Sequence, residues 1–344
     1  MIMSVVAGIG WHLVGAASAA AFYAPYKKVQ GWSWELMWSI GGLFSWVLMP
    51  WIVTSMLVPN LAEFYADIPL STFAMLMFCG ALWGIGNITY GLTMRYLGLS
   101  MGIGIAIGLN LAVGTLLPPI IKGKFGELMS SNGSTLTMLG IAVALVGIAI
   151  VTFAGNAKEK AMGQKAEEFN LRKGVTLAII CGIFSAGFAF GLDAAGPIRA
   201  QSEALGINYL YVAMPAYGFI MGGGAIVNFG FCIFNIVTKK EISIRHDISI
   251  GKSLLIRNLL FSAMGGIMWY LQFFFYGWGE ASVPENLGYI NWMLHMSGYV
   301  LFGGVIGLVM AEWKGVGTRP VRILILGLLV ITAAANIVGM GMAV

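Results

Sequence analysis

Two histidines lie inside long apolar stretches, where an ionisable side chain is costly and therefore a candidate for function. His12 lies in the first stretch and His295 in the ninth. Each imidazole could hydrogen-bond a ligand hydroxyl or carry a proton near neutral pH. The alternative for each is a neutral histidine bonded to a neighbouring helix. Both are therefore candidates for ligand binding and for proton transfer.

Glu35 is the third ionisable candidate, near the start of the second apolar stretch in the segment 32–38 (WSWELMW). A carboxyl group among apolar side chains holds its proton more readily than one in water. Glu35 could therefore carry a proton. The simpler alternative is a charged carboxylate paired with Lys27 or Lys28 at the membrane interface.

Amide and aromatic side chains in other stretches suit a ligand rich in hydroxyl groups. Asn87 and Gln272 each carry an amide, which offers both donors and an acceptor. Aromatic rings can pack on the C–H face of a sugar and hydrogen-bond at its rim. The aromatic candidates are Trp83, Tyr90, Trp269 and Trp292. The alternatives are hydrogen bonds between helices for the amides, and lipid contact or an interfacial position for the aromatics.

The composition places these residues in a membrane protein. Hydrophobic residues make up 59% of the chain and charged residues 10%, whereas soluble domains carry roughly 25% charged residues. The net charge of +5 comes from basic residues in short loops between apolar runs, so it does not indicate a nucleic-acid partner. The chain instead needs a lipid bilayer to cover its surface.

Ten apolar runs are long enough to cross a bilayer. Every backbone polar group in lipid must be bonded internally, so each run is expected to be a helix. The sequence thus predicts an all-α membrane protein with ten transmembrane helices. The runs are 2–24, 33–58, 70–93, 99–121, 134–154, 174–196, 208–237, 253–277, 289–311 and 320–342.

The distribution of lysine and arginine predicts the orientation. The loops that follow odd-numbered runs, together with the adjoining helix ends, hold 16 of the 19 basic residues, and those that follow even-numbered runs hold 3, namely Lys122, Lys124 and Arg199. Short cytoplasmic loops are enriched in lysine and arginine. The odd loops are therefore expected in the cytoplasm, and both termini in the periplasm.

Weak internal similarity predicts two halves. Gly80-x-x-Trp83 recurs as Gly266-x-x-Trp269, Gly15-x-x-Ser18 as Gly182-x-x-Ser185, and Gly140-x-x-Val143 as Gly327-x-x-Val330. Five helices per half would invert the second half in the membrane, an architecture known among transporters. We expect two inverted five-helix repeats, 1–155 and 174–344, joined by a cytoplasmic linker at 156–173.

Several enzyme signatures are absent from the sequence. It contains no Walker A motif, no G-x-S-x-G and no H-E-x-x-H. We therefore expect neither an enzyme nor an ATP-driven pump, and no cofactor or metal ion.

Ten stretches, spread over essentially the whole chain, carry a resemblance to a known family: 11–20, 22–29, 32–35, 83–98, 102–108, 165–170, 182–187, 269–276, 292–297 and 334–339. Through these stretches the chain resembles the L-rhamnose–proton symporters, within the drug/metabolite transporter superfamily. The resemblance implies proton-driven uptake of L-rhamnose, and possible uptake of L-lyxose or a related 6-deoxy or pentose sugar, across the bacterial cytoplasmic (inner) membrane. It implies no particular binding residue.

The alternatives keep the same fold. One is an exporter of small metabolites or drugs, and another is a sugar sensor that does not transport. If the chain is instead a sugar–proton symporter, the sugar would bind between the two halves. Its candidate contacts are His12, Asn87, Tyr90, Trp83, Trp269, Gln272, Trp292 and His295. The candidate proton carriers are Glu35, His12 and His295.

Overall fold

Helices account for all the regular structure in the described part of the chain. The computed structural model describes residues 2–121, 123, 125–130, 132–162, 169–283 and 289–342. In order, the elements are α1 (Ile2–Ala21), α2 (Tyr23–Tyr26), α3 (Trp34–Gly42), the π-helix η1 (Leu43–Leu48), α4 (Met49–Leu57), α5 (Leu61–Ala66), α6 (Leu70–Leu97), α7 (Leu99–Ile121), α8 (Phe125–Ser130), α9 (Ser134–Met162), α10 (Leu171–Ala194), α11 (Gly196–Ala204), the 3₁₀ turns η3 (Tyr209–Tyr211) and η4 (Met214–Ala216), α12 (Tyr217–Thr238), α13 (Ile244–Ile248), α14 (Lys252–Ser282), α15 (Tyr289–Val309) and α16 (Thr318–Met342).

Eight helical segments of the described residues are long and apolar enough to cross a membrane. They are Val6–Tyr26, Trp34–Leu57, Leu70–Leu97, Ser134–Lys158, Leu171–Ala194, Tyr209–Thr238, Lys252–Ser282 and Thr318–Gly341. Two shorter apolar segments, Leu99–Val113 and His295–Val309, lie in α7 and α15. The prediction of an all-α membrane protein is therefore confirmed. Each of the ten apolar runs of the sequence overlaps at least one helix of the structure.

The second predicted run is a helix of mixed geometry. Ser33 begins it, because its hydroxyl accepts a hydrogen bond from the Leu36 N–H at 3.3 Å and satisfies one free donor of the first turn. The α-helical turns of α3 then give way to the π-helical η1 before α4 continues to Leu57. A π segment inside an α-helix is rare and is frequent at functional sites.

The chain forms two compact units, each built from several segments. Unit 1 comprises Met1–Ala20, Ile88–Ala186 and Trp278–Val344, and unit 2 comprises Ala21–Asn87 and Gly187–Gly277. Each unit therefore contains residues from both predicted halves of the chain. Helices α1, α6, α10 and α14 contribute residues to both units, α1 only through Ala21.

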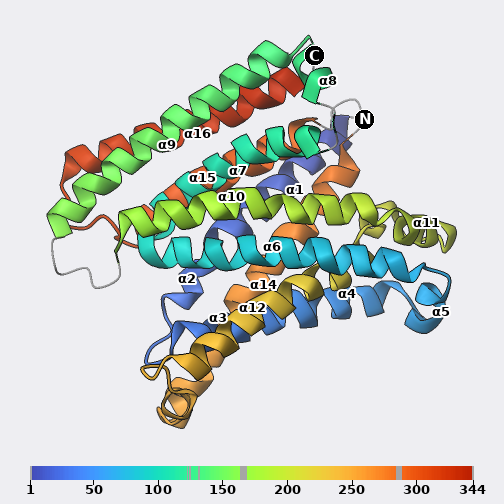
Figure 1. The fold of residues 1–344 in the computed structure, drawn as a ribbon, viewed down its shortest axis with the longest axis horizontal. Helices are drawn as coiled ribbons and strands as arrows, with labels where there is room; N and C mark the ends of the chain where they lie inside the picture. The colour runs from blue at the N-terminus through green and yellow to red at the C-terminus, as the bar shows by residue number, and fades with distance from the viewer. Residues whose placement is uncertain are drawn as a thin grey trace. The chain divides into compact units, whose positions relative to one another are not determined.

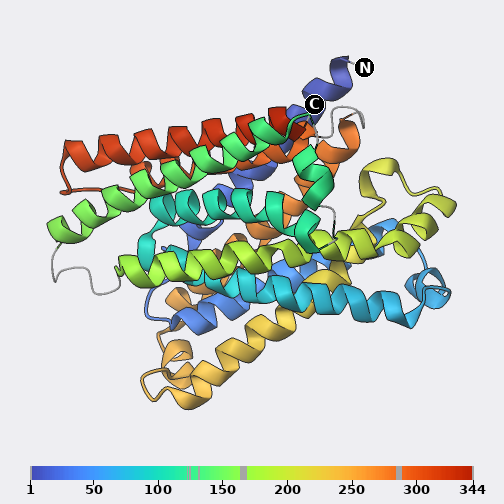
Figure 2. The same ribbon diagram turned by 45° about the horizontal axis from the view of Figure 1, so that its top comes forward.

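In unit 1, α9 and α16 lie side by side along their lengths (Figures 1 and 2). A methyl group at Gly140 would lie 3.1 Å from the carbonyl oxygen of Ala334, and one at Gly147 would lie 3.2 Å from that of Gly327. As the residue number rises in α9 it falls in α16, so the two helices run antiparallel. Small residues allow this close backbone approach where no hydrophobic effect drives helices together.

In unit 2, two glycines permit equally close helix packing. The backbone of α6 at Gly80 lies against the carbonyl of Ile220 in α12. The backbone of α14 at Gly266 lies against the carbonyl of Gly41 in α3. A side chain at either glycine would overlap the opposing carbonyl group. These two contacts fix α12 on α6 and α3 on α14.

Candidate functional site

In unit 1, His12 is held in place by an amide from α15. Its side chain is fully buried, and its Nε2 donates a hydrogen bond to Asn291 Oδ1 at 2.8 Å. The ring also lies against Gly279 of α14, where an added methyl group would lie 2.6 Å from Nε2. The amide oxygen can only accept, so Nε2 carries a proton and Nδ1 is the nitrogen that can gain or lose one.

A row of polar aromatic side chains continues from His12 through unit 1. The ring centroids of His12 and His295 are 6.2 Å apart, and those of His295 and Tyr299 are 6.1 Å apart. The hydroxyl groups of Tyr299 and Tyr90 are hydrogen-bonded at 2.6 Å. All four side chains are buried. The structure thus brings together His12, His295 and Tyr90 from the predicted set, with groups suited to hydroxyl binding or proton exchange.

In unit 2, the two repeated tryptophans contact the same ring. Trp83 of α6 and Trp269 of α14 both lie edge-on to Phe273, with centroid separations of 5.8 and 6.1 Å. Phe188 packs at a tilt against Phe273, with centroids 4.5 Å apart, and Phe22 packs at a tilt against Trp269 at 4.4 Å. These rings form one aromatic cluster in which Phe273 is partly exposed and the other four rings are buried. The side chain of Trp292, the remaining aromatic candidate, lies outside the described residues.

The two amide candidates, also in unit 2, differ in their hydrogen bonding. Gln272 donates from Nε2 to the Trp269 carbonyl at 3.1 Å, within its own helix. Asn87 is 2% exposed, and neither its nitrogen nor its oxygen has a hydrogen-bond partner among the described residues. Asn87 follows Trp83 by four residues, so the two lie on one face of α6. A buried amide without partners is costly, which favours a role for Asn87 in ligand binding.

Glu35 is buried in unit 2 and does not form the ion pair that was the simpler alternative. It is 4% exposed in the first turn of α3, and its Oε1 accepts a hydrogen bond from Asn235 Nδ2 at 3.0 Å. Within the described part of the chain, neither Lys27 nor Lys28 lies within ion-pair distance of it.

Several further polar residues of these helices were not predicted from the sequence. Asn228 accepts from Trp38 Nε1 at 2.9 Å and donates to the carbonyls of Gly84 at 3.1 Å and Gly224 at 2.8 Å. Asn235, Asn291 and Tyr299 make the contacts described above. Asn87 was predicted because it is a polar side chain within an apolar run, and the same criterion applies to each of these three asparagines. No sequence signal pairs them with their partners.

Two carboxylates from the connections between spans, Glu312 in a turn and Asp247 in the short helix α13, hold the starts of helices. In unit 1, Glu312 accepts hydrogen bonds from the backbone N–H groups of Leu99 at 2.8 Å and Ser100 at 3.1 Å, at the start of α7. In unit 2, Asp247 Oδ2 accepts from the backbone and the hydroxyl of Ser33, at 3.0 and 2.6 Å. Negative charge at a helix N-terminus is stabilising. Among the described residues, no cluster of His, Cys, Asp and Glu could hold a metal ion.

Comparison with known proteins places the whole chain in one family. The family described as L-rhamnose-proton symport protein (RhaT) matches residues 1–344. The chain belongs to this family. Its curated relatives include the L-rhamnose-proton symporters of Escherichia coli O157:H7, 58% identical over 343 residues and 100% of both chains, and of Mannheimia succiniciproducens, 57% identical over 340 residues and 99% of both. No solved structure matches the chain.

Proposed function

We propose that the chain is a symporter that imports L-rhamnose with protons across the bacterial inner membrane. The observation that carries this proposal is the full-length identity of 58% to curated L-rhamnose-proton symporters. The apolar helices agree with a multi-pass membrane protein. Family members and these relatives are transporters, which supports the expectation that the chain is not an enzyme. L-Lyxose remains a second candidate substrate.

We also propose ten spans arranged as two inverted five-helix repeats, 1–155 and 174–344. The strongest support lies in unit 1. Gly140 and Gly327 are equivalent in the repeated motif, and so are Gly147 and Ala334, because both pairs are 187 residues apart. The contacts Gly140–Ala334 and Gly147–Gly327 are therefore the same contact made twice. Equivalent helices that cross antiparallel in this way are related by a two-fold axis, as inverted repeats require.

Unit 2 supports the same relation. Gly80 and Gly266 are equivalent in the other repeated motif, and each lies against a carbonyl group of a helix from the opposite half. The boundaries of the two segments that make up unit 2 agree with the repeat as well. Shifting its first segment, 21–87, by the 186 residues that separate these glycines gives 207–273, which falls inside its second segment, 187–277.

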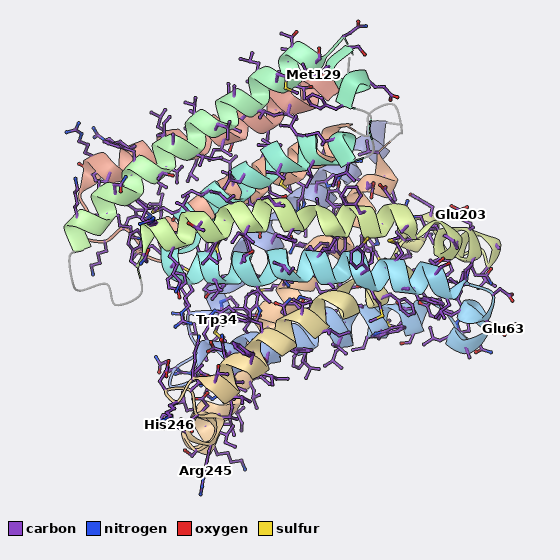
Figure 3. The ribbon with its side chains drawn as sticks, in the orientation of Figure 1. Trp34, Glu63, Met129, Glu203, Arg245 and His246 are labelled. Atoms are coloured by element: carbon purple, nitrogen blue, oxygen red, sulfur yellow. The ribbon has the colours of Figure 1, made fainter. Side chains whose placement is uncertain are left out.

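Both termini are proposed to be periplasmic, with the odd loops in the cytoplasm. In unit 1, the described chain ends lie at the same end as α8, which belongs to an even loop (Figure 1). In unit 2, Glu63 and Glu203 of even loops lie at one end, and Arg245 and His246 of an odd loop lie at the other (Figure 3). The basic end would face the cytoplasm by the positive-inside rule.

The proposed sugar contacts are His12, His295 and Tyr90 in unit 1 and Trp83, Asn87, Trp269 and Gln272 in unit 2, with Trp292 retained from the sequence. The proposed proton carriers are Glu35, His12 and His295. A proton can favour the loaded state only if its affinity differs between the two states of the carrier. Burial of all three side chains supports such a difference, because an ionised group is stabilised more in a water-accessible state than in a dry one.

Counterflow in proteoliposomes tests the proposal. Vesicles preloaded with L-rhamnose should take up labelled rhamnose, and an inward proton gradient should drive accumulation that a protonophore abolishes. Accumulation that persists with the protonophore would contradict proton coupling. Binding of rhamnose without counterflow would indicate a sensor. Accumulation only from the cytoplasmic face, in vesicles of defined orientation, would indicate an exporter.

A further inference from the structure

The crossing of α3 and α14 in unit 2 is followed by two buried hydroxyl groups that have no hydrogen-bond partner among the described residues. The helices run in the same direction. Asn258, near the start of α14, exchanges two hydrogen bonds with the backbone of Gln30, just before α3, at 3.2 and 2.7 Å. Further along both helices, Gly266 lies against the carbonyl of Gly41. Because the helices run in the same direction, we expect the residues one turn beyond Gly41 and one turn beyond Gly266 to lie opposite each other.

Those residues are Ser45 and Tyr270. Each follows its crossing glycine by four residues, so each lies on the face of its helix that points to the other. Ser45 is 1% exposed and Tyr270 is 0% exposed. Neither hydroxyl has a hydrogen-bond partner among the described residues, and they do not bond each other. Ser45 also belongs to the π-helical η1, a geometry frequent at functional sites.

The hydroxyl of Ser45 differs from those of two other buried residues of unit 2, whereas that of Ser262 in α14, which is 0% exposed, likewise has no partner among the described residues. Thr54, in α4, donates to the carbonyl of Pro50 four residues earlier, and Ser202 donates to that of Ile198 in the same way. The equivalent acceptor for Ser45 is the carbonyl of Gly41, which the backbone of Gly266 covers. The helix crossing thus removes the local partner that a buried serine ordinarily uses.

We propose that Ser45 and Tyr270 bind one hydroxyl group of the transported sugar. A sugar hydroxyl can donate to one side chain and accept from the other, which satisfies all three groups. The inference rests on the proposed function and adds two specificity-determining residues to its site. A site built to bond a hydroxyl group discriminates against an analogue that lacks it.

Binding of L-rhamnose and its 2-, 3- and 4-deoxy analogues to purified full-length variants tests the proposal. Ser45→Ala and Tyr270→Phe should each weaken rhamnose binding roughly three- to tenfold, the effect of one lost hydrogen bond. One deoxy analogue should bind the wild type and both variants equally, because the hydroxyl that they contact is missing. Thr54→Ala and Tyr65→Phe are matched controls that should bind as the wild type does. Thr54 bonds within its own helix, and Tyr65 donates to the carbonyl of Pro215 at 2.8 Å.

The outcomes separate this inference from the proposed function. Unchanged rhamnose affinity in both variants would overturn the inference, and would mean that water alone serves the two hydroxyls. If the two variants bound rhamnose and all three deoxy analogues more weakly by the same factor, the inference would also be overturned, because the two residues would then affect the stability or shape of the protein rather than contact one hydroxyl group. A wild-type protein that binds no rhamnose would overturn the proposed function and, with it, the inference.

Discussion

At the scale of single residues, the buried polar side chains fall into two groups. Asn228 has partners for its oxygen and for its amide nitrogen, all from neighbouring helices or its own. Asn87, Ser45 and Tyr270 have none among the described residues. A polar group with every bond made stabilises the fold, whereas one without partners is costly unless a ligand or water completes it. The two groups therefore predict different consequences of substitution.

Asn228→Ala and Asn87→Ala form a matched pair. We expect Asn228→Ala to lower the free energy of unfolding by about 1–2 kcal/mol, because the Trp38 N–H and the Gly84 carbonyl lose their partner in a medium without water. Asn87→Ala breaks no hydrogen bond among the described residues, so its melting temperature should be close to that of the wild type while rhamnose binding weakens. Thermal unfolding and rhamnose binding, each measured on both variants in detergent, test these two expectations. A reversed pattern would contradict these assignments.

Glu35→Gln tests the proton carrier. A glutamine oxygen can still accept from Asn235, so the local structure should be kept while the titrating group is lost. If Glu35 carries the proton, rhamnose counterflow should persist and accumulation driven by a pH gradient should fall at least tenfold. Glu203→Gln, an exposed control, should change neither. Normal accumulation in Glu35→Gln would leave His12 and His295 as the candidates.

At the scale of elements, the sequence predicts where helices lie but not how they meet. Each apolar run contains a helix because the length and hydropathy of a span are local properties. The π segment at Leu43–Leu48 had no sequence signal. The abundance of glycine indicated close packing, but which glycines face a carbonyl depends on helix rotation and on the partner, which single-sequence patterns do not encode. For the same reason, the hydrogen-bond partners of Asn228 and Glu35 could not be predicted from the sequence.

Glycine substitutions test the crossings. Gly80→Ala and Gly266→Ala should each cost more than about 2 kcal/mol or abolish folding, since the added methyl group would overlap a backbone carbonyl that cannot move aside. Gly222→Ala and Gly230→Ala in α12 should be close to neutral, because, apart from the local backbone of α12, no atom of the described residues would lie within 4 Å of the added methyl group. Monodispersity on size-exclusion chromatography and melting temperature report the difference. Equal tolerance at all four sites would contradict the packing.

At the scale of the whole molecule, the charge pattern predicts the orientation in the membrane and the repeat motifs predict two halves, and both stay predictions. The alternation of basic and non-basic loops is a property of the entire chain, so it does not depend on any single helix boundary. For the candidate site, the structure shows which of the predicted residues lie together. His12, His295 and Tyr90 come together in unit 1, and Trp83 and Trp269 in unit 2. Their neighbours Asn291, Tyr299 and Phe273 depend on tertiary packing and could not be read from spacing.

Cysteine accessibility tests the proposed topology in intact cells. In a background with the native cysteines replaced, Glu63→Cys and Glu203→Cys should react with a membrane-impermeant maleimide. Arg245→Cys and Lys314→Cys should react only after permeabilisation, because the basic loops are proposed to face the cytoplasm. All four positions are exposed, so burial would not mask a reaction. The opposite pattern would invert the topology.

The seam between α9 and α16 has a consequence for the origin of the chain. Each helix presents its small residues to the matching residues of the other, at Gly140 with Ala334 and at Gly147 with Gly327. On the proposed repeat relation, an ancestral polypeptide of half the length would carry a surface complementary to its own upside-down copy. Such a polypeptide, inserted in both directions, could assemble as an antiparallel homodimer, and fusion of two gene copies would have made that pairing permanent.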